Sequence, residues 1–171
     1  MKKINLILLV LPFILFSCDS TDDLLSTGQF DSTFTGSITK EFNGEAAFVH
    51  VLVVSSTPKG SSLAIGLSTV ANQDENITLT VGESDNTDGI VAGTYILDSN
   101  ATSGPLFLPS YVNGQEIWFP NESLTNKIII SSVGNNLVKG SFEINMIKGT
   151  SQLDEITIKG TFNAVGTTTT Q

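Results

Sequence analysis

The segment Val138-Lys139-Gly140-Ser141-Phe142-Glu143-Ile144-Asn145-Met146, written VKGSFEINM, decides the fold class. Its apolar side chains fall on one face and its polar side chains on the other, with the period of two that is typical of a half-buried β-strand. The segment 158–164, IKGTFNA, repeats the same order of residue types. The two copies predict a hairpin or two strands of one sheet. Both glycines would face inward, where a missing side chain accommodates a bulky residue opposite or marks a bulge.

Other parts of the chain follow the same period. Apolar and polar residues alternate in the segments 62–67 and 76–81, which predicts two more strands with one buried face. The segments 46–54, AAFVHVLVV, and 128–130 are apolar on both faces, as expected for central strands or strands covered on both sides.

Turn residues separate these segments. The pairs Asn113-Gly114 and Asp88-Gly89 favour two-residue hairpin turns. The spacing predicts an all-β domain over residues 30–166, with roughly nine or ten short strands in an antiparallel β-sandwich or, alternatively, a β-barrel. Residues 167–171 are interpreted as a polar C-terminal tail.

The N-terminus has the pattern of an export signal. Two lysines follow Met1, and the apolar run 4–16 ends just before Cys18, the only cysteine of the 171 residues. The run is shorter than the ~20 apolar residues that span a bilayer, and Pro12 interrupts it. We therefore predict a signal peptide over residues 1–17 rather than an N-terminal core helix.

The residues Leu15-Phe16-Ser17-Cys18 resemble the lipobox of bacterial lipoprotein precursors, although Phe16 is bulkier than the usual residue there. The resemblance implies cleavage before Cys18, diacylglycerol on its sulfur and acylation of the new amino group. Two or three acyl chains give a durable membrane anchor, whereas one chain binds only marginally.

Residues 18–29 are interpreted as the lipidated cysteine and a flexible acidic tether. The run 19–23, DSTDD, resembles the signal that sends Bacteroidota lipoproteins to the outer face of the outer membrane. A solvated linker is the alternative interpretation of this run, and the periplasmic leaflet is the alternative location.

The charge of the chain excludes one class of partner. The formal net charge is −9, and loss of Lys2 and Lys3 with the signal peptide would make it more negative by two. A surface of this kind repels nucleic acid, so we expect no nucleic-acid partner. With Cys18 lipidated, the domain has no disulfide and must be stabilised by its hydrophobic core.

The chain also resembles a family of small Bacteroidota lipoproteins with a domain of unknown function. The resemblance depends on the lipobox and on three strand motifs, Gly93-Thr94-Tyr95-Ile96, Gly140-Ser141-Phe142 and Gly160-Thr161-Phe162-Asn163. It implies an all-β domain over most of residues 30–165 and no particular activity.

Catalytic signatures are weak. The only histidine, His50, lies within an apolar strand, where a hydrogen-bonded core or edge residue is the expected role. No Gly-x-Ser-x-Gly elbow is present, so we expect a non-enzymatic domain. A hydrolase of glycans or peptides that uses paired carboxylates is the alternative.

No cofactor is expected, but one acidic loop is a weak candidate for a calcium site. The acidic loop around Asp85, Asn86 and Asp88 partly fits a calcium-binding loop, but Tyr95 occupies the position of the bidentate glutamate. The loop therefore fails as an EF-hand, and an acidic turn is the favoured interpretation.

Two aromatic residues are candidates for ligand contact. Trp118 is out of phase with Ile117 and Phe119, so it would face solvent or a partner if those two faced the core. Together with Tyr111, an exposed Trp118 would stack on a sugar ring or anchor a protein contact. Burial of both faces of this segment is the alternative.

Two serines match a three-residue O-glycosylation pattern of Bacteroidota, Ser20 in Asp19-Ser20-Thr21 and Ser32 in Asp31-Ser32-Thr33. The sequence as a whole predicts a lipid-anchored envelope protein whose all-β domain binds a glycan or an envelope protein. An accessory subunit of an outer-membrane complex is a further alternative.

Overall fold

The computed structural model describes residues 27–55, 59–69, 72–100 and 104–171. They form ten strands: β1 (Gly28–Gly36), β2 (Lys40–Val53), β3 (Gly60–Thr69), β4 (Asn72–Ser84), β5 (Gly93–Ile96), β6 (Leu106–Asn113), β7 (Glu116–Pro120), β8 (Lys127–Val133), β9 (Leu137–Lys148) and β10 (Ser151–Thr170). These residues include no helix, and hence no helix with the length and apolar character needed to cross a bilayer.

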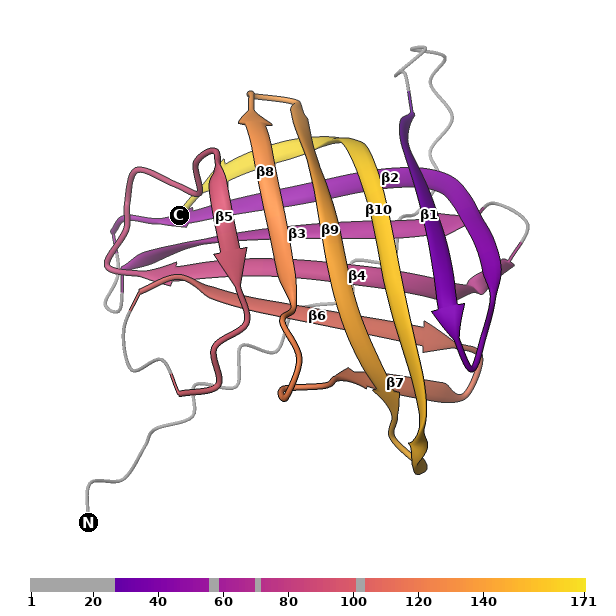
Figure 1. The fold of residues 1–171 in the computed structure, drawn as a ribbon. Helices are drawn as coiled ribbons and strands as arrows, with labels where there is room; N and C mark the ends of the chain where they lie inside the picture. Colours follow the sequence, from indigo (N-terminus) through magenta and orange to yellow (C-terminus); the bar gives the residue numbers. More distant parts are fainter. Residues whose placement is uncertain (1–26, 56–58, 70–71, 101–103) are drawn as a thin grey trace.

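The ten strands form two layers within one continuous sheet. Figure 1 shows β5, β8, β9, the first part of β10 and β1 crossing steeply over β2, β3, β4 and β6. The sheet order is β1-β10-β2-β3-β4-β6-β7-β9-β8-β5. An additional β10–β9 pairing closes the sheet into a ring, and β1 also pairs with β2. The predicted all-β fold with about ten strands is confirmed. The pairing of β10 with β2 is parallel, whereas the prediction was antiparallel throughout.

β10 belongs to both layers. Its first part pairs with β1 and β9, and residues 165–170 pair with β2, where Thr167 lies opposite Val49. Gln171 continues the contact, because its backbone N–H donates to the Leu52 carbonyl over 2.8 Å. The predicted C-terminal tail is therefore wrong. A run of threonines is polar, but β-branched residues suit a strand.

The domain also begins earlier than predicted. Gly28 and Gln29 already belong to β1, where Gln29 lies opposite Asn163 of β10. Residues 18–26 of the predicted tether, with Cys18, and the signal peptide lie outside the described residues.

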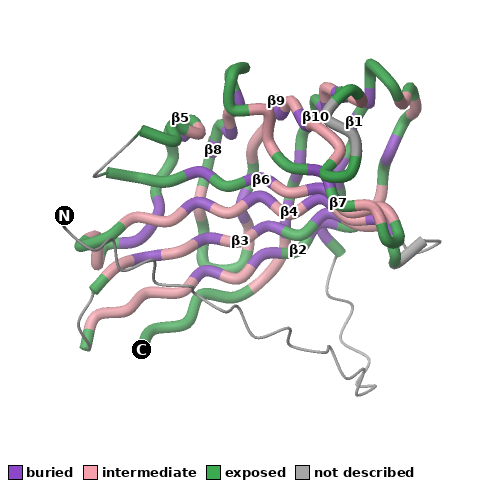
Figure 2. Tube along the Cα trace, turned by 90° about the horizontal axis from the view of Figure 1, so that it is seen from below, coloured by how far each residue is buried: buried purple, intermediate pink, exposed green. Residues whose placement is uncertain are grey.

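The core fills the space between the layers, and Figure 2 shows buried positions alternating with more exposed ones along the strands. The inward residues that the period of two predicted are at most 4 % exposed: Leu63, Ile65, Leu67, Ile77, Leu79, Val81, Val138, Phe142, Ile144, Met146, Ile158, Phe162 and Ala164. The alternation of apolar and polar side chains thus decides which face of each of these strands is buried in the core.

The repeated segments pair with each other, as predicted. Gly160 of β10 lies opposite Phe142 of β9, and Gly140 of β9 lies opposite Phe162 of β10. A Cβ atom at Gly140 would lie 2.6 Å from the Phe162 ring, and one at Gly160 would lie 2.8 Å from the Phe142 ring. Each glycine makes room for the phenylalanine of the other copy.

One of the two predicted hairpin turns forms. Gly114 has a positive φ of 60°, and β6 and β7 pair on either side of it through Asn113 and Glu116. The Asp88-Gly89 prediction is wrong, because β5 pairs with β8 in the opposite layer rather than with β4. Gly89 has a positive φ of 93°, but it lies in a connection between layers.

Candidate functional site

Polar side chains cover the outer face of five neighbouring strands, β2, β1, β10, β9 and β8. The strand register arranges them in two rows that cross the strands. One row contains Asn43, Asp31, Thr161, Ser141 and Ile129, and the other contains Glu41, Thr33, Lys159, Glu143 and Lys127. Each strand contributes one residue to each row, because alternate side chains point to the same face.

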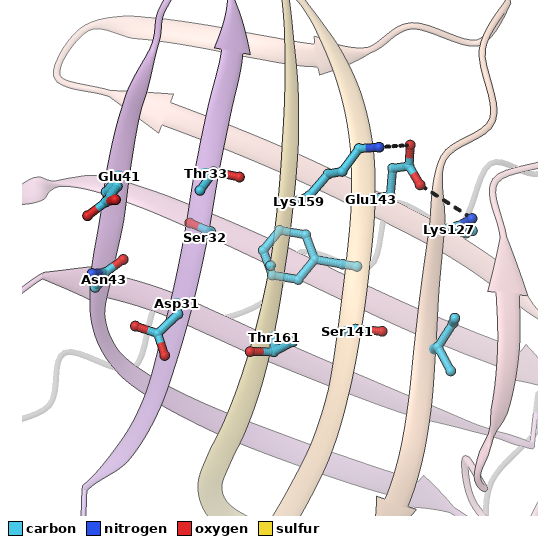
Figure 3. A pocket seen from close by; sticks show the side chains of 13 residues that line it. Asp31, Ser32, Thr33, Glu41, Asn43, Lys127, Ser141, Glu143, Lys159 and Thr161 are labelled. Atoms are coloured by element: carbon cyan, nitrogen blue, oxygen red, sulfur yellow. Dashed lines mark ion pairs between the residues drawn. The ribbon is translucent and has the colours of Figure 1, made fainter.

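These rows line a hollow of about 570 Å³, which we call the polar groove. Figure 3 shows Glu41 and Asn43 on one side, Lys127 on the other, and the side chains of three strands between them. Gly160 and Phe142 also contribute to the lining. The groove therefore offers carboxylate, amide, hydroxyl and ammonium groups within one depression.

Glu143 joins two lysines in the groove. Its carboxylate lies 2.8 Å from the ammonium of Lys159 and 3.3 Å from that of Lys127. Figure 3 shows both ion pairs as dashed lines. The hydrogen bonds from Lys159 and then Lys127 lower the pKa of Glu143, so it stays ionised.

The acids at the other end of the groove are not neutralised in this way. Asp31 of β1 and Glu41 of β2 are exposed, and neither takes part in any of the four ion pairs of the described residues. Their carboxylates are free to accept hydrogen bonds or a positive charge from a bound molecule.

A second, smaller hollow of about 170 Å³ lies beside the groove. It includes Thr157 and Asn145, which lie opposite each other on β10 and β9 one row beyond Lys159 and Glu143. Thr157 Oγ1 donates to Asn145 Oδ1 over 2.8 Å, and Asn145 Nδ2 donates to the Thr125 carbonyl over 2.8 Å. These side chains bond each other, so this hollow offers fewer free groups than the polar groove.

Trp118 and Tyr111 do not form an exposed platform, which corrects the prediction. Trp118 is 2 % exposed and Tyr111 is fully buried, whereas Ile117 and Phe119 are more than half exposed. The two rings lie opposite each other on β6 and β7, with centroids 6.2 Å apart. Strand β7 is only five residues long, so its pattern could not decide which face turns inward.

Tyr111 also belongs to a buried polar cluster. Its hydroxyl donates to the Glu75 carboxylate over 2.5 Å, and the same carboxylate pairs with the ammonium of Lys40. Burial, followed by the bond to Glu75, raises the pKa of the Tyr111 hydroxyl. Since the cluster satisfies its own polar groups, its role is structural.

His50 is a hydrogen-bonded core residue, as the sequence predicted. It is 5 % exposed on β2, and its Nε2 accepts a hydrogen bond from the Ile90 N–H over 3.1 Å. Burial lowers its pKa. His50 therefore fastens the connection between β4 and β5 to the core.

Of the three candidate calcium residues, Asn86 bonds within its own loop, while the Asp85 N–H donates to the Lys59 carbonyl over 3.0 Å. Asn86 Nδ2 donates to Glu83 over 2.6 Å and to the Gly89 carbonyl over 3.1 Å, while Asn86 Oδ1 accepts from the Asp88 N–H. Asp85 has a positive φ of 62°. No group of three or more acidic, histidine or cysteine side chains suited to a metal occurs in the described part of the chain.

The structure also corrects one modification site. Ser32 is 4 % exposed, and its Oγ donates to the Phe42 carbonyl over 2.7 Å, so it cannot carry a glycan. It points inward because Asp31 and Thr33 on either side point outward. Ser20 lies outside the described residues.

Sequence reasoning missed the polar groove. The alternation around Ser141 and Thr161 did indicate a solvent-exposed face. What it did not indicate is that Asp31 and Glu41, more than 80 positions earlier in the chain, lie on the neighbouring strands. Comparisons with protein-family models, with curated proteins and with solved structures found no match to this chain.

Proposed function

We propose that this chain is a lipid-anchored envelope protein whose all-β domain binds a partner molecule through the polar groove. The observation that carries the proposal is a hollow of about 570 Å³ lined by side chains of five strands. Its volume falls within the ~300–1,000 Å³ of ligand sites, and strands hold side chains more rigidly than loops do.

The anchor and the location depend on the N-terminal pattern. A basic start, a short apolar run and Cys18 support lipidation, and the acids that follow support display on the outer face of the outer membrane. A domain held there by a tether would meet glycans and other envelope proteins.

Binding is favoured over hydrolysis by the state of the acids in the groove. A carboxylate hydrolase needs one acid with a raised pKa to protonate the leaving group. The pKa of Glu143 is lowered instead, because two lysines hold its charged form. Glu143 is thus suited to organising Lys127 and Lys159 and unsuited to donating a proton.

The test uses the full chain in its native envelope, captured after chemical cross-linking. Thr161→Trp places a bulky ring in the groove, and Thr80→Trp on β4 is the matched control in the other layer. We expect a cross-linked partner with the wild type and with Thr80→Trp, and its loss with Thr161→Trp. Equal recovery with both variants would exclude the groove as the site, and cleavage of the partner would favour the hydrolase.

A further inference from the structure

The polar groove has separated charges, and we propose that it takes an extended polypeptide segment whose acidic and basic side chains are grouped at opposite ends. This inference rests on the proposed function and specifies its ligand. Complementary charge across an interface fixes orientation and suppresses wrong partners.

The positive end lies over β8, β9 and β10. Lys127, Lys139 and Lys159 all point outward there, and Glu143 lies between Lys127 and Lys159. The other exposed acid on this face of β10, Glu155, lines the second hollow and accepts a hydrogen bond from Asn121. Lys139 lies opposite Asn163, one row beyond Ser141 and Thr161. Even with Glu155 counted, three ammonium groups against two carboxylates leave this end positive, although the chain as a whole carries −9.

The negative end lies over β1 and β2. Asp31, Glu41 and Glu45 are exposed on the outer face of these strands, and none of them takes part in an ion pair of the described residues. A ligand would therefore place its basic groups over β1 and β2 and its acidic groups over β8–β10.

The spacing of the strands sets the spacing of the ligand charges. Neighbouring strands lie about 4.8 Å apart, so β1 and β9 are separated by roughly 10 Å and β2 and β8 by roughly 19 Å. An extended peptide rises about 3.3 Å per residue. Its acidic and basic groups should thus lie roughly three to six residues apart.

Features beside the charges favour a polypeptide over a glycan. The rows continue onto β5, where Ile96 lies opposite Lys127, and Ile96 and Ile129 are 49 % and 40 % exposed. They offer an apolar contact next to the positive end. Sugar rings commonly stack on exposed aromatic rings, but the only aromatic residue that lines the groove, Phe142, is 4 % exposed.

The probes are synthetic nonapeptides with blocked ends. The dipolar peptide is Val-Thr-Glu-Thr-Glu-Thr-Lys-Thr-Lys, and its reversed sequence covers the opposite chain direction. The control, Val-Thr-Glu-Thr-Lys-Thr-Glu-Thr-Lys, has the same composition with mixed charges. Titration into the detergent-solubilised full chain should show one dipolar peptide binding about tenfold tighter than the control, from two or more partly exposed charge pairs.

A charge variant identifies the site of binding. Asp31→Lys with Glu41→Lys makes both ends of the groove positive, so we expect the dipolar preference to disappear. An all-acidic peptide, with Glu replacing both Lys, should then bind best. The matched control, Asp74→Lys with Glu122→Lys, exchanges acids outside the groove lining and should keep the wild-type preference. Circular dichroism checks that both variants are folded.

Three outcomes would overturn the inference. The first is equal affinity for the dipolar and mixed peptides. The second is a preference for the dipolar peptide that survives Asp31→Lys with Glu41→Lys. The third is that the protein binds carboxymethyl-chitosan, a glycan with both charges, and binds none of the peptides. If partner capture in the envelope still depends on Thr161, only the polypeptide inference fails and the binding function stands.

Discussion

Gly160 is a position where a single methyl group would disturb two strands. A Cβ atom there would lie 2.6 Å from the Asp31 carbonyl oxygen of β1 and 2.8 Å from the Phe142 ring of β9. The carbonyl belongs to the backbone, so it can move only if β1 shifts. The groove lies directly over this contact.

We therefore expect Gly160→Ala to lower the free energy of unfolding by about 1–3 kcal/mol, the usual cost of overpacking. Urea denaturation monitored by fluorescence measures the change. Gly66→Ala on β3 is the control, because no atom lies within 4 Å of its added Cβ. Its effect should stay within about 0.5 kcal/mol, and equal losses for the two variants would contradict the packing argument.

His50 makes stability depend on pH in a predictable direction. Its pKa is lowered in the folded state, so the unfolded chain binds the proton more readily once the pH falls below the ordinary value near 6.5. The free energy of unfolding should therefore be highest above pH 6.5 and decrease as the pH falls toward the folded-state pKa. The proton would also remove the acceptor that Nε2 offers to the Ile90 N–H.

Denaturation curves between pH 8 and pH 5.5 test this prediction. His50→Gln keeps an acceptor but does not titrate, and the sequence contains no other histidine. The variant should lose the slope between pH 6.5 and 5.5. A slope that persists in His50→Gln would assign the effect to other groups.

At the scale of the element, β7 shows how a short strand misleads sequence reasoning. Its apolar residues occupy both faces, so alternation fits either orientation. The structure turns Trp118 inward, where it packs beside Tyr111 and under the Lys148 ammonium, 6.0 Å from the ring centroid. Ile117 and Phe119 take the exposed face.

Burial predicts losses of stability of very different size for two neighbouring aromatic residues. Trp118→Ala should lower the free energy of unfolding by about 3–5 kcal/mol, because it leaves a cavity in the core. Phe119→Ala should cost less than about 1 kcal/mol, since its ring is 53 % exposed. Thermal melting of both variants measures the difference, and a larger loss for Phe119→Ala would reverse the assignment of faces.

Longer strands were easier to predict. Residues 62–67, 76–81 and 138–146 alternate over enough positions to fix the inward face, and the structure confirms their inward residues. The paired glycines and phenylalanines of β9 and β10 were predictable because the segments repeat. Strand neighbours that are distant in sequence were not, because alternation reports which face is buried and not which strand lies beside it.

At the scale of the whole molecule, anchoring and folding should be separable. Cys18→Ser removes the predicted lipid site, which lies ten positions before β1 begins. We expect the variant to leave the membrane fraction while the domain keeps its β-rich circular dichroism spectrum. A variant that stays firmly membrane-bound after a carbonate wash would refute lipidation at Cys18.

The end of β10 provides a second test at this scale. Deleting residues 167–171 removes the parallel partner of Val49–Leu52 and leaves one edge of β2 unpaired. Since exposed edges promote association, we expect a lower melting temperature and soluble aggregates by light scattering. A monomeric variant with an unchanged melting temperature would show that this pairing is dispensable.

The position of β10 between β1 and β2 has a consequence for biogenesis. Thr35 of β1 donates to the Thr157 carbonyl of β10, a bond that joins residues 122 positions apart. Contacts of this kind form slowly, because a long loop must close first. In the export that we propose, β1 would therefore stay unpaired while the chain passes through the channel, until β10 has emerged. This delay would keep the precursor unfolded and competent for translocation until nearly all of it has crossed.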